Sequence, residues 1–256
     1  MKLVSWNVNS LRSAEEKFLQ FLNSEQPEVV MLQEVRAHPD QLSLFLKFVP
    51  GYEAIFNHSG RPGYGGTAIY YRRQLPFSQI TTKVGNEVLD TEGRAIYGLL
   101  ANWHLFNFYV PNGSGGGKRL KYKHQFLQQI GDFIQKLLSA KQSVVIGADM
   151  NVAHTELDLY SPKTNLQSSG FLLEARKIFD QLLAIGLTDT FRLFEKGGGH
   201  DTWWSLRDPK RLQDKGWRYD YFLISSNLKD KVKKSVILKN VFGSDHCPIM
   251  LEIETV

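Results

Sequence analysis

Cysteine is almost absent from this chain of 256 residues, which contains only Cys247. A single cysteine excludes an internal disulfide and is typical of proteins from reducing compartments. Long apolar runs are also missing, because none approaches the ~20 residues that a membrane-spanning helix needs. The N-terminus turns polar at Ser5, too early for a secretory signal peptide. We therefore expect an intracellular protein of the cytoplasm or nucleoid, with no membrane partner.

Neither sign of charge dominates. The chain has 31 Lys and Arg against 26 Asp and Glu, a formal net charge of +5, and 42% of its residues are hydrophobic. This modest basic excess is compatible with a polyanionic partner but does not require one. No repeat, low-complexity segment or shift in charge marks a boundary. We therefore expect a single domain over residues 1–256 and, by default, a monomer.

Hydrophobic periodicity predicts many strands and several amphipathic helices. The expected strands cover residues 2–8, 29–32, 52–56, 67–72, 95–101, 105–110, 144–148, 219–224 and 232–238, with a last one from 248. A capping-box pattern in residues 13–16 predicts the start of the first helix. Further helices are expected at 38–48, 119–140 and 171–185, and Gly186 would end the last of them. Hairpins mixed with β-helix-β segments predict an α/β fold with at least one mixed sheet.

Polar residues follow several of these apolar strands. The run 144–148 stops at Asp149 and Asn151, which period-2 alternation places on one side. Alone, this pattern favours an ordinary Asx turn. The pattern recurs, however, at Asn7, Glu34, Tyr109, Asp220 and Asp245-His246. In an open α/β sheet such strand ends can converge on one crevice.

These residue types suit metal-assisted phosphoryl transfer. Glu34 offers a hard oxygen and no cysteine or histidine cluster competes, which favours Mg²⁺ or Mn²⁺ over zinc. Asp149 could accept a proton from an attacking water. His246 could stabilise phosphoryl oxygens, with its tautomer fixed by a carboxylate such as Asp220. The neutral hydrogen-bond donors to developing charge would be Asn7, Asn151 and Tyr109.

Six segments carry a family resemblance. They are Trp6-Asn7-Val8-Asn9, Leu32-Gln33-Glu34, Tyr109-Val110-Pro111-Asn112-Gly113, Asp149-Met150-Asn151, Trp217-Arg218-Tyr219-Asp220-Tyr221 and Ser244-Asp245-His246-Cys247-Pro248. Their order and content resemble the exonuclease III family of abasic-site (AP) endonucleases, within the endonuclease/exonuclease/phosphatase superfamily. Asp-x-Asn and Ser-Asp-His identify only the superfamily. Ser169-Gly170-Phe171 and Thr202-Trp203-Trp204 help to narrow the match to the AP endonuclease branch.

The resemblance implies a fold and an activity. The fold would be a four-layer α/β sandwich, with two packed mixed β-sheets flanked by helices as in DNase I. The activity would be Mg²⁺-dependent hydrolysis, with Mn²⁺ as a possible substitute, of the phosphodiester 5′ to an abasic site in double-stranded DNA, leaving a 3′-hydroxyl. The balance with 3′→5′ exonuclease, 3′-phosphodiesterase and uridine-directed nicking stays open.

The resemblance also implies residue roles. The metal would be held by Glu34, with Asn7, Asn9 and Asp245 as further ligands. The catalytic group would be Asp149, Asn151, His246, Asp220 and Tyr109. The DNA backbone would contact Asn112 and Asn165, and a pocket for a baseless sugar would be walled by Trp203, Trp217 and Tyr219.

Two arginines are candidate DNA contacts on charge alone. Arg119 opens a helix with three lysines, and cations at a helix start oppose the helix dipole, which hints at a phosphate partner. Arg207 lies in a basic loop interleaved with aromatic residues, a pattern that suits nucleic acid. A solvated face is the alternative for this loop, and a small core under the loop is the alternative for the tryptophans.

Four positions depart from the family pattern. Ala148 replaces a common glycine, Arg36 a lysine and Ser168 an asparagine, while Tyr219 replaces an aliphatic residue and leaves the pocket size open. None removes a catalytic group. Two other functions remain as alternatives: another phosphoesterase of the superfamily, acting on an inositol phosphate, phospholipid or RNA, and a non-catalytic DNA-binding module.

Overall fold

The structure is a computed structural model that describes residues 1–205 and 210–255. Its strands are β1 (Lys2–Asn7), β2 (Val29–Gln33), β3 (Tyr52–Asn57), β4 (Thr67–Arg72), β5 (Phe77–Thr81), β6 (Ala95–Leu100), β7 (Trp103–Tyr109), β8 (Ser143–Asp149), β9 (Leu187–Asp189), β10 (Asp220–Ser225), β11 (Val232–Ile237) and β12 (Ile249–Ile253). Its α-helices are α1 (Glu15–Glu25), α2 (Leu44–Lys47), α3 (Gly117–Ser139), α4 (Leu173–Ala184) and α5 (Phe191–Phe194). Short 3₁₀ helices are η1 (Pro39–Gln41), η2 (Thr91–Gly93), η3 (Glu156–Asp158), η4 (Pro162–Thr164), η5 (Lys210–Gln213) and η6 (Ser226–Lys231).

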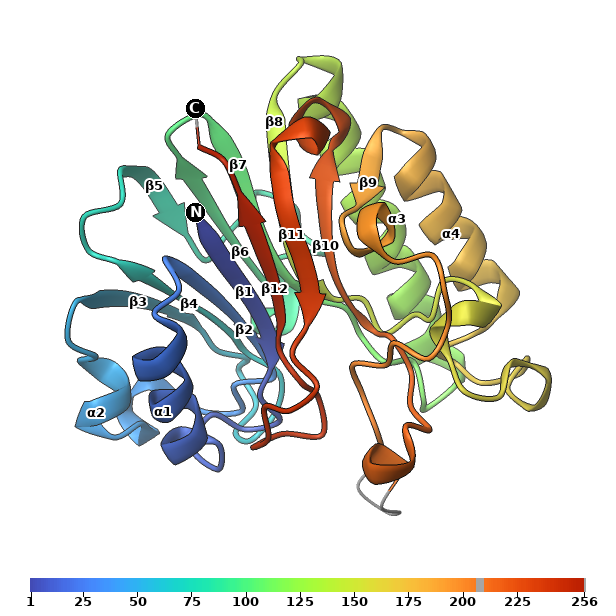
Figure 1. The fold of residues 1–256 in the computed structure, drawn as a ribbon, viewed down its shortest axis with the longest axis horizontal. Coiled ribbons are helices and arrows are strands. Elements are labelled where there is room, and N and C mark those ends of the chain that lie inside the picture. The colour runs from blue at the N-terminus through green and yellow to red at the C-terminus, as the bar shows by residue number, and fades with distance from the viewer. Residues whose placement is uncertain (206–209, 256) are drawn as a thin grey trace.

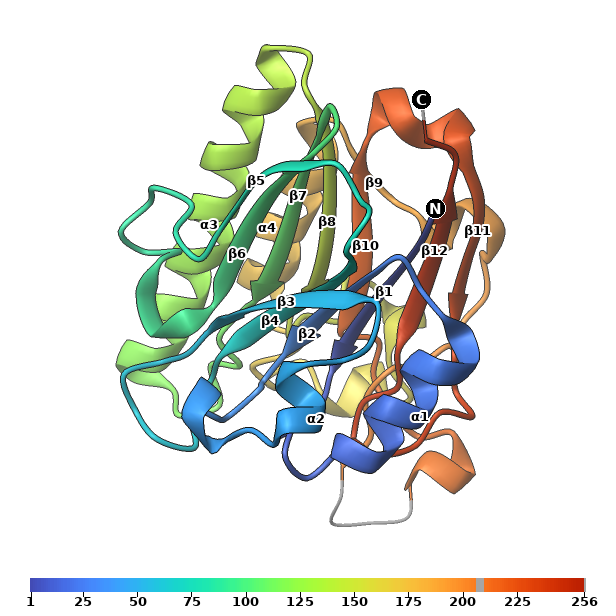
Figure 2. The same cartoon turned by 90° about the vertical axis from the view of Figure 1, so that its left-hand side faces the viewer.

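Two mixed sheets of six strands form the centre of the molecule. One has the order β11-β12-β1-β2-β4-β3 and the other β5-β6-β7-β8-β10-β9. Helices α1 and α2 lie beside the first sheet and α3 and α4 beside the second (Figures 1 and 2). The predicted four-layer α/β sandwich is therefore confirmed. Within the described ranges, no helix is long and apolar enough to cross a membrane.

Each interface between layers has its own apolar core. Residues such as Met31, Val145 and Phe222 fill the space between the sheets. Phe18 and Tyr70 belong to the core under α1, whereas α3 and α4 cover the outer face of the second sheet. Every central strand is thus buried on both faces, which explains why β1, β2 and β8 are nearly continuous apolar runs.

The structure corrects several expectations about local structure. Helix α1 begins after Ala14 with no side-chain cap, so the predicted capping box is wrong; the backbone N–H of Ser13 instead donates to Ser10 Oγ. The segment 38–48 forms only η1 and α2, because the extended backbone of Leu42 and Ser43 interrupts it; Pro39 begins η1. Strands β5 and β9 were not predicted. β5 is largely exposed, and β9 has only three residues, so neither carries a strong hydrophobic pattern.

A buried polar bridge joins the two sheets. Asn107 on β7 donates from Nδ2 to the carbonyl oxygens of Leu32 and Ala68, at 3.0 and 2.9 Å, in the opposite sheet. Its Oδ1 accepts from Gln33 Nε2 at 2.8 Å, and Gln33 also donates to Ser5 Oγ at 2.9 Å. Because buried polar groups are costly when unpaired, this bridge fixes how one sheet sits on the other.

We predict that Asn107→Ala lowers the free energy of unfolding by about 3 kcal/mol, since it deletes three buried hydrogen bonds that contribute roughly 1 kcal/mol each. Urea unfolding followed by circular dichroism measures the change. Asn102→Ala, in the exposed turn between β6 and β7, is the matched control and should shift stability by less than about 0.5 kcal/mol. Equal unfolding midpoints for the two variants would contradict the bridge.

Candidate active site

Strand direction brings the predicted site residues to one end of the sandwich. β1 is parallel to β2, with Asn7 opposite Gln33, and β7 is parallel to β8, with Tyr109 opposite Asp149. β10 is antiparallel to β8 and begins there, so Asp220 is the other neighbour of Asp149. Residues opposite each other on adjacent strands share one face of a sheet. Tyr109, Asp149 and Asp220 therefore lie in a row at this end of the sandwich.

Asp149 lies at the centre of a hydrogen-bond network that joins the two sheets. The Asn7 Nδ2 of β1 donates to its Oδ2 at 2.9 Å. Asn151 donates to both carboxylate oxygens, from its backbone N–H at 2.9 Å and from Nδ2 at 3.1 Å. The carboxylate is thus held in one orientation by three donors, while only 1% of the residue is exposed.

Glu34 lies beside this network at the end of β2. Its Oε2 accepts from Asn7 Nδ2 at 2.9 Å, and its Oε1 accepts from Arg36. The Glu34 carboxylate lies close enough to the Tyr109 hydroxyl to contribute to its raised pKa. Asn7 Oδ1 accepts the backbone N–H of Asn9 at 3.0 Å, so the amide of Asn7 faces the two carboxylates as a donor. Asn7 is therefore oriented to hold Glu34 and Asp149 rather than to offer its oxygen to a cation.

These residues fit a hard divalent cation with few protein ligands. Glu34 offers a carboxylate at the crevice whose side chain is 14% exposed. Among residues 1–205 and 210–255, no three His, Cys, Asp or Glu residues come close enough to enclose a metal. Mg²⁺ keeps several waters and takes one or two carboxylates, whereas zinc needs a fuller protein cage. Asp245 accepts from Trp203 Nε1 at 2.9 Å, which ties this predicted ligand to the aromatic loop.

His246 is paired with Asp220 on the other side of Asp149. His246 Nδ1 lies 2.8 Å from Asp220 Oδ2, and the same oxygen accepts from Thr202 Oγ1 at 2.6 Å. The Trp6 indole N–H donates to the His246 carbonyl oxygen at 3.2 Å. Because Nδ1 is engaged in the hydrogen bond to Asp220, Nε2 is the imidazole nitrogen left for a ligand.

Burial and neighbouring charges set the protonation states of this cluster. Burial raises the pKa of Asp149 to about 7, with a further rise from Asp220 and an opposing effect of His246. Despite burial, the Asp220 carboxylate raises the pKa of His246 to about 10. Burial, Glu34 and Asp149 raise the pKa of the Tyr109 hydroxyl well above 10. At neutral pH the cluster thus combines a cationic His246, a protonated Tyr109 and an Asp149 near its titration midpoint.

The chain leaves these strands in an unusual backbone conformation. Asn9, Glu34, Arg36 and Asn151 all have positive φ angles, of 43°, 58°, 52° and 50°. Left-handed backbone is costly for residues other than glycine and tends to occur at functional sites. At Asn151 this conformation also ends the strand. Asn151 does lie on the same side as Asp149, as predicted, but the reason is not strand alternation: the turn folds its amide back onto the carboxylate.

Three aromatic rings lie beside the Asp220 end of the cluster. The Tyr219 ring packs on Trp203 and Trp217 at centroid distances of 5.5 and 5.4 Å, so it lies against both indoles. A Cβ added to Gly170 would come within 2.0 Å of the Tyr219 hydroxyl, so only glycine leaves room for this ring. Phe171 and Leu159 are buried against the same group. The three predicted pocket residues are therefore in contact, with Tyr219 only 9% exposed.

The other predicted DNA contacts are differently placed. Asn112 accepts the backbone N–H and the hydroxyl of Ser114, both at 3.1 Å. Asn165 donates to the Ser161 carbonyl oxygen at 2.8 Å and accepts from Ser168 Oγ at 3.0 Å. Both asparagines therefore shape their own loops. Arg207 lies outside the described residues.

The predicted DNA contact Arg119 belongs to an arginine cluster behind Tyr109, whose other member, Arg94, was missed by the sequence analysis. Arg94 donates to the Tyr109 carbonyl oxygen at 2.9 Å and lies 4.5 Å from the centroid of its ring. Glu92 accepts from Arg94 at 2.8 Å and twice from Arg119 at 3.0 Å. With Glu34, Arg36 and Asn112, these arginines line a cavity of about 320 Å³. Arg94 precedes an ordinary apolar strand and follows no motif, so no sequence signal could have identified it.

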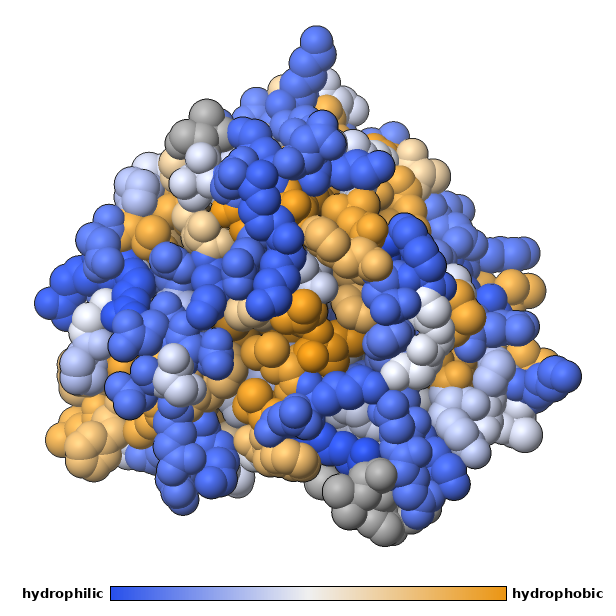
Figure 3. All heavy atoms as spheres, in the orientation of Figure 1, coloured by the Kyte–Doolittle hydropathy of each residue, from blue (hydrophilic) through white to orange (hydrophobic). Residues whose placement is uncertain are grey.

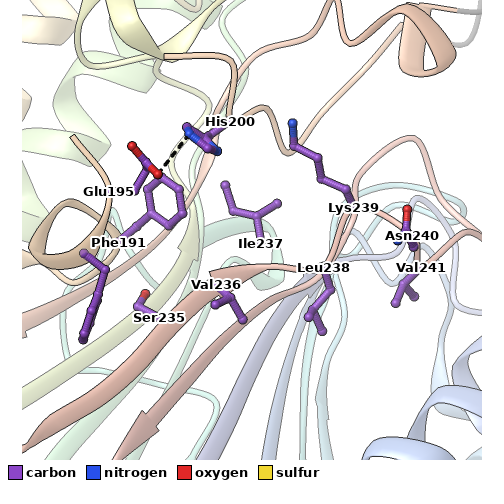
Figure 4. Close-up of a pocket in the computed structure, with 11 residues that line it drawn as sticks. Phe191, Glu195, His200, Ser235, Val236, Ile237, Leu238, Lys239, Asn240 and Val241 are labelled. Carbon is purple, nitrogen blue, oxygen red and sulfur yellow. Dashed lines mark ion pairs between the residues drawn. The ribbon is translucent and has the colours of Figure 1, made fainter. Parts of the chain in front are cut away.

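A second cavity, of about 720 Å³, lies along the edge strand β11 and the segment after α5. Its floor includes Val236 and Leu238, and His200 pairs with Glu195 at its rim at 3.4 Å (Figure 4). Figure 3 shows apolar residues at the surface in the middle of the view, around the lower end of β11. None of the predicted site residues is among those that line it.

Residues 4–246 match the model of the Endonuclease/Exonuclease/phosphatase family. The chain belongs to this family. It is 37% identical over 256 residues to an exodeoxyribonuclease of Bacillus subtilis, covering 99% of both chains. It is 36% identical to a DNA-(apurinic or apyrimidinic site) endonuclease of Dictyostelium discoideum, covering 99% of this chain and 71% of that protein. A solved AP endonuclease from Archaeoglobus fulgidus superimposes with a TM-score of 0.90 at 24% identity over the whole of both chains.

These comparisons confirm the exonuclease III type of family resemblance that the motifs predicted. A family match over nearly the whole chain, with two nucleases among the relatives that match 99% of its length, makes this protein a hydrolytic nuclease. The cluster of Asn7, Glu34, Asp149 and His246 is the candidate site for its chemistry.

The His246–Asp220 pair predicts a specific dependence of stability on pH. The folded pKa of His246, about 10, exceeds its ordinary value of 6.5, so the pair stabilises the fold fully below 6.5 and loses this contribution as pH rises through 10. Asp220→Asn should therefore be destabilised by a few kcal/mol at pH 7.5, with the deficit shrinking toward pH 10. Thermal unfolding in EDTA at fixed ionic strength measures this.

The exposed Asp230→Asn variant is the control for this measurement and should follow the wild type at every pH. Starting at pH 7.5 avoids most of the titration of Asp149, whose folded pKa is about 7. Parallel curves for Asp220→Asn and the wild type would show that the pair does not carry this stability.

Proposed function

We propose that this nuclease hydrolyses the phosphodiester 5′ to an abasic site in double-stranded DNA, with the aid of Mg²⁺, and leaves a 3′-hydroxyl. The observation that carries the proposal is the Asn7–Asp149–Asn151 network beside the His246–Asp220 pair, which supports a proton-accepting carboxylate next to a phosphate-binding imidazolium. Relatives named as an exodeoxyribonuclease and as an apurinic or apyrimidinic site endonuclease support the choice of DNA and of the lesion.

Asp149 acts on the attacking water. A pKa of about 7 suits a group that must accept a proton at neutral pH, and its three donors fix the direction in which the free lone pairs point. Asn7 and Asn151 orient this carboxylate. Asn151 can also redirect its amide from the Val110 carbonyl oxygen, 2.9 Å away, to a phosphate oxygen.

His246 and Tyr109 bind the scissile phosphate. The imidazolium offers its Nε2 proton, because Nδ1 is held by Asp220. The Tyr109 hydroxyl stays protonated and can donate to a phosphate oxygen. Both donors are fixed before the substrate arrives, which lowers the cost of stabilising charge in the transition state.

Glu34 would hold the cation, with Asn9 and Asp245 as further partners. When bound, Mg²⁺ would neutralise charge on the phosphate oxygens and orient them. Asn7 keeps the Glu34 carboxylate in place with its amide at 2.9 Å.

The DNA contacts two surfaces beside the catalytic groups, one basic and one aromatic. Arg119 and Asn112 line the cavity behind Tyr109, where a neighbouring phosphate fits. Trp203, Tyr219 and Trp217 form the apolar surface that receives the baseless sugar, since a lesion without its base is cheap to turn out of the duplex.

An end-labelled duplex with one stable abasic analogue tests the proposal. We expect a single nick 5′ to the lesion in Mg²⁺, none in EDTA, and no nick in an undamaged duplex. Intact abasic DNA in Mg²⁺, with a folded enzyme, would overturn it in favour of another phosphoesterase activity. A ladder on the undamaged duplex would instead identify an exonuclease as the main activity.

We predict that Asp149→Asn cuts the cleavage rate by about 10³-fold while the enzyme still binds the abasic duplex, because the amide cannot accept a proton from water. Single-turnover cleavage and fluorescence anisotropy in EDTA measure the two quantities. Asp132→Asn on the exposed face of α3 is the control and should cleave at the wild-type rate. Near-normal cleavage by Asp149→Asn would remove Asp149 from the mechanism.

A second prediction concerns the pocket. Tyr219→Leu should raise the rate of internal abasic incision about tenfold relative to the removal of a 3′-phosphate at a nick, since the smaller side chain opens space beside Trp203 and Trp217. The ratio of the two rates on matched duplexes is the measurement. An unchanged ratio would mean that the sugar does not enter between these rings.

A further inference from the structure

Helix α3 presents one charged residue where its pattern calls for an apolar one. The buried face of the helix is formed by Phe126, Leu127, Ile130 and Ile134, at the spacing of an apolar stripe. The next position of that stripe toward the N-terminus is Lys123, whose exposure is 0%. Burying an ammonium group is expensive unless it is well bonded, so a lysine here requires an explanation.

The Lys123 ammonium group bonds only to main-chain carbonyl oxygens among its described hydrogen-bond partners. Its Nζ donates to Ser169 O at 2.6 Å, to Asn151 O at 2.7 Å and to Asn112 O at 3.4 Å. No carboxylate in the described ranges forms an ion pair with it, and Asp149 acts on it only as a nearby charge. Burial outweighs that attraction and lowers the pKa of Lys123 to about 7.

The three carbonyl groups belong to three separate segments of the crevice. Asn112 lies in the turn after β7, and the Gly113 that follows packs against the Lys123 side chain, since an added Cβ would be 3.0 Å from its Cδ. Asn151 lies in the turn after β8 and orients Asp149. Ser169 precedes Gly170, the residue that makes room for Tyr219. One side chain therefore contacts three loops: that of Asn112 in the phosphate cavity, that of Asn151 beside Asp149, and that of Ser169 beside the aromatic pocket.

We propose that Lys123 is a positioning residue, whose buried ammonium group clamps the turns at Asn112, Asn151 and Ser169 at fixed separations. This rests on the proposed function for its catalytic consequence, but not for the clamp itself. Because one donor group bonds three carbonyl groups, it couples the positions of the three loops, and a displacement of one loop displaces the others. Its action on the reaction runs through Asn151 and the orientation of Asp149, and Lys123 itself touches no substrate.

Hydrogen exchange tests the clamp without any assay of activity. In full-length Lys123→Met, which keeps the length of the side chain but removes the donor, amides in residues 111–117, 150–154 and 166–171 should exchange about tenfold faster or more. Amides of β2 and β4 should keep their wild-type rates. Lys136→Met, at an exposed position of the same helix, is the control and should change none of the three segments. Unchanged exchange in these segments of Lys123→Met would overturn the clamp.

A double-mutant cycle tests how the clamp acts on the reaction. With saturating abasic duplex and Mg²⁺, Lys123→Met should slow single-turnover cleavage about tenfold or more. In an Asn151→Ala background the same change should cost less than about threefold, because the group that Lys123 positions is already gone. Equal factors in the two backgrounds would overturn action through Asn151.

The two experiments separate failure of this inference from failure of the proposed function. If the wild type does not cleave abasic DNA, the proposed function fails, and the exchange experiment still decides whether Lys123 holds the loops. If Lys123→Met does not fold, Lys123→Gln replaces it in both experiments. Its shorter side chain ends in an amide with two N–H groups, too few to bond all three carbonyl groups, so the same outcomes are assigned to it.

Discussion

The candidate active site depends on how firmly one sheet is held against the other. Asn7 and Glu34 come from the first sheet, whereas Tyr109, Asp149 and Asp220 come from the second. The Asn7–Asp149 hydrogen bond of 2.9 Å therefore exists only if the sheets keep one relative position. Apolar packing alone is non-directional and would allow the sheets to slide. The buried bonds of Asn107 to two carbonyl groups of the opposite sheet supply the missing direction.

The residues proposed for chemistry lie at strand ends, and those proposed for recognition lie mostly on loops. The groups proposed for chemistry lie at or just beyond strand ends, where register fixes their spacing, as in the row of Tyr109, Asp149 and Asp220. The groups proposed for recognition lie mostly on loops, which need other supports. Thr202 is one: its hydroxyl donates to Asp220 and accepts the backbone N–H of Tyr219 at 3.0 Å, so it joins the aromatic surface to the His246 pair.

Much of this arrangement was predictable from sequence, because parallel strands such as β1 with β2 and β7 with β8 bring their polar ends together. Asp220 and His246 reach the same place differently, from the start of antiparallel strands. The prediction could not reach contacts between segments far apart in the chain. Arg94 stacks on Tyr109, and Lys123 meets three loops, yet neither belongs to a motif. Local rules also failed at β9, which has only three residues, and in the segment 38–48, where apolar spacing is present but Leu42 and Ser43 have extended backbone. Such features depend on tertiary contacts that periodicity does not encode.

The places where local rules fail are themselves informative. A lysine on an apolar helix face, left-handed Glu34 and Asn151, and an aspartate with 1% exposure each cost stability. All of them lie within one crevice. The buried Arg218, in another part of the fold, is paired with Asp158 and Asp189, each at 2.7 Å. Among the described residues, Asp149 and Lys123 have no such ion pair and are held by amide, backbone N–H and carbonyl groups instead. That difference is expected where a phosphate, a cation and a water complete the set of contacts.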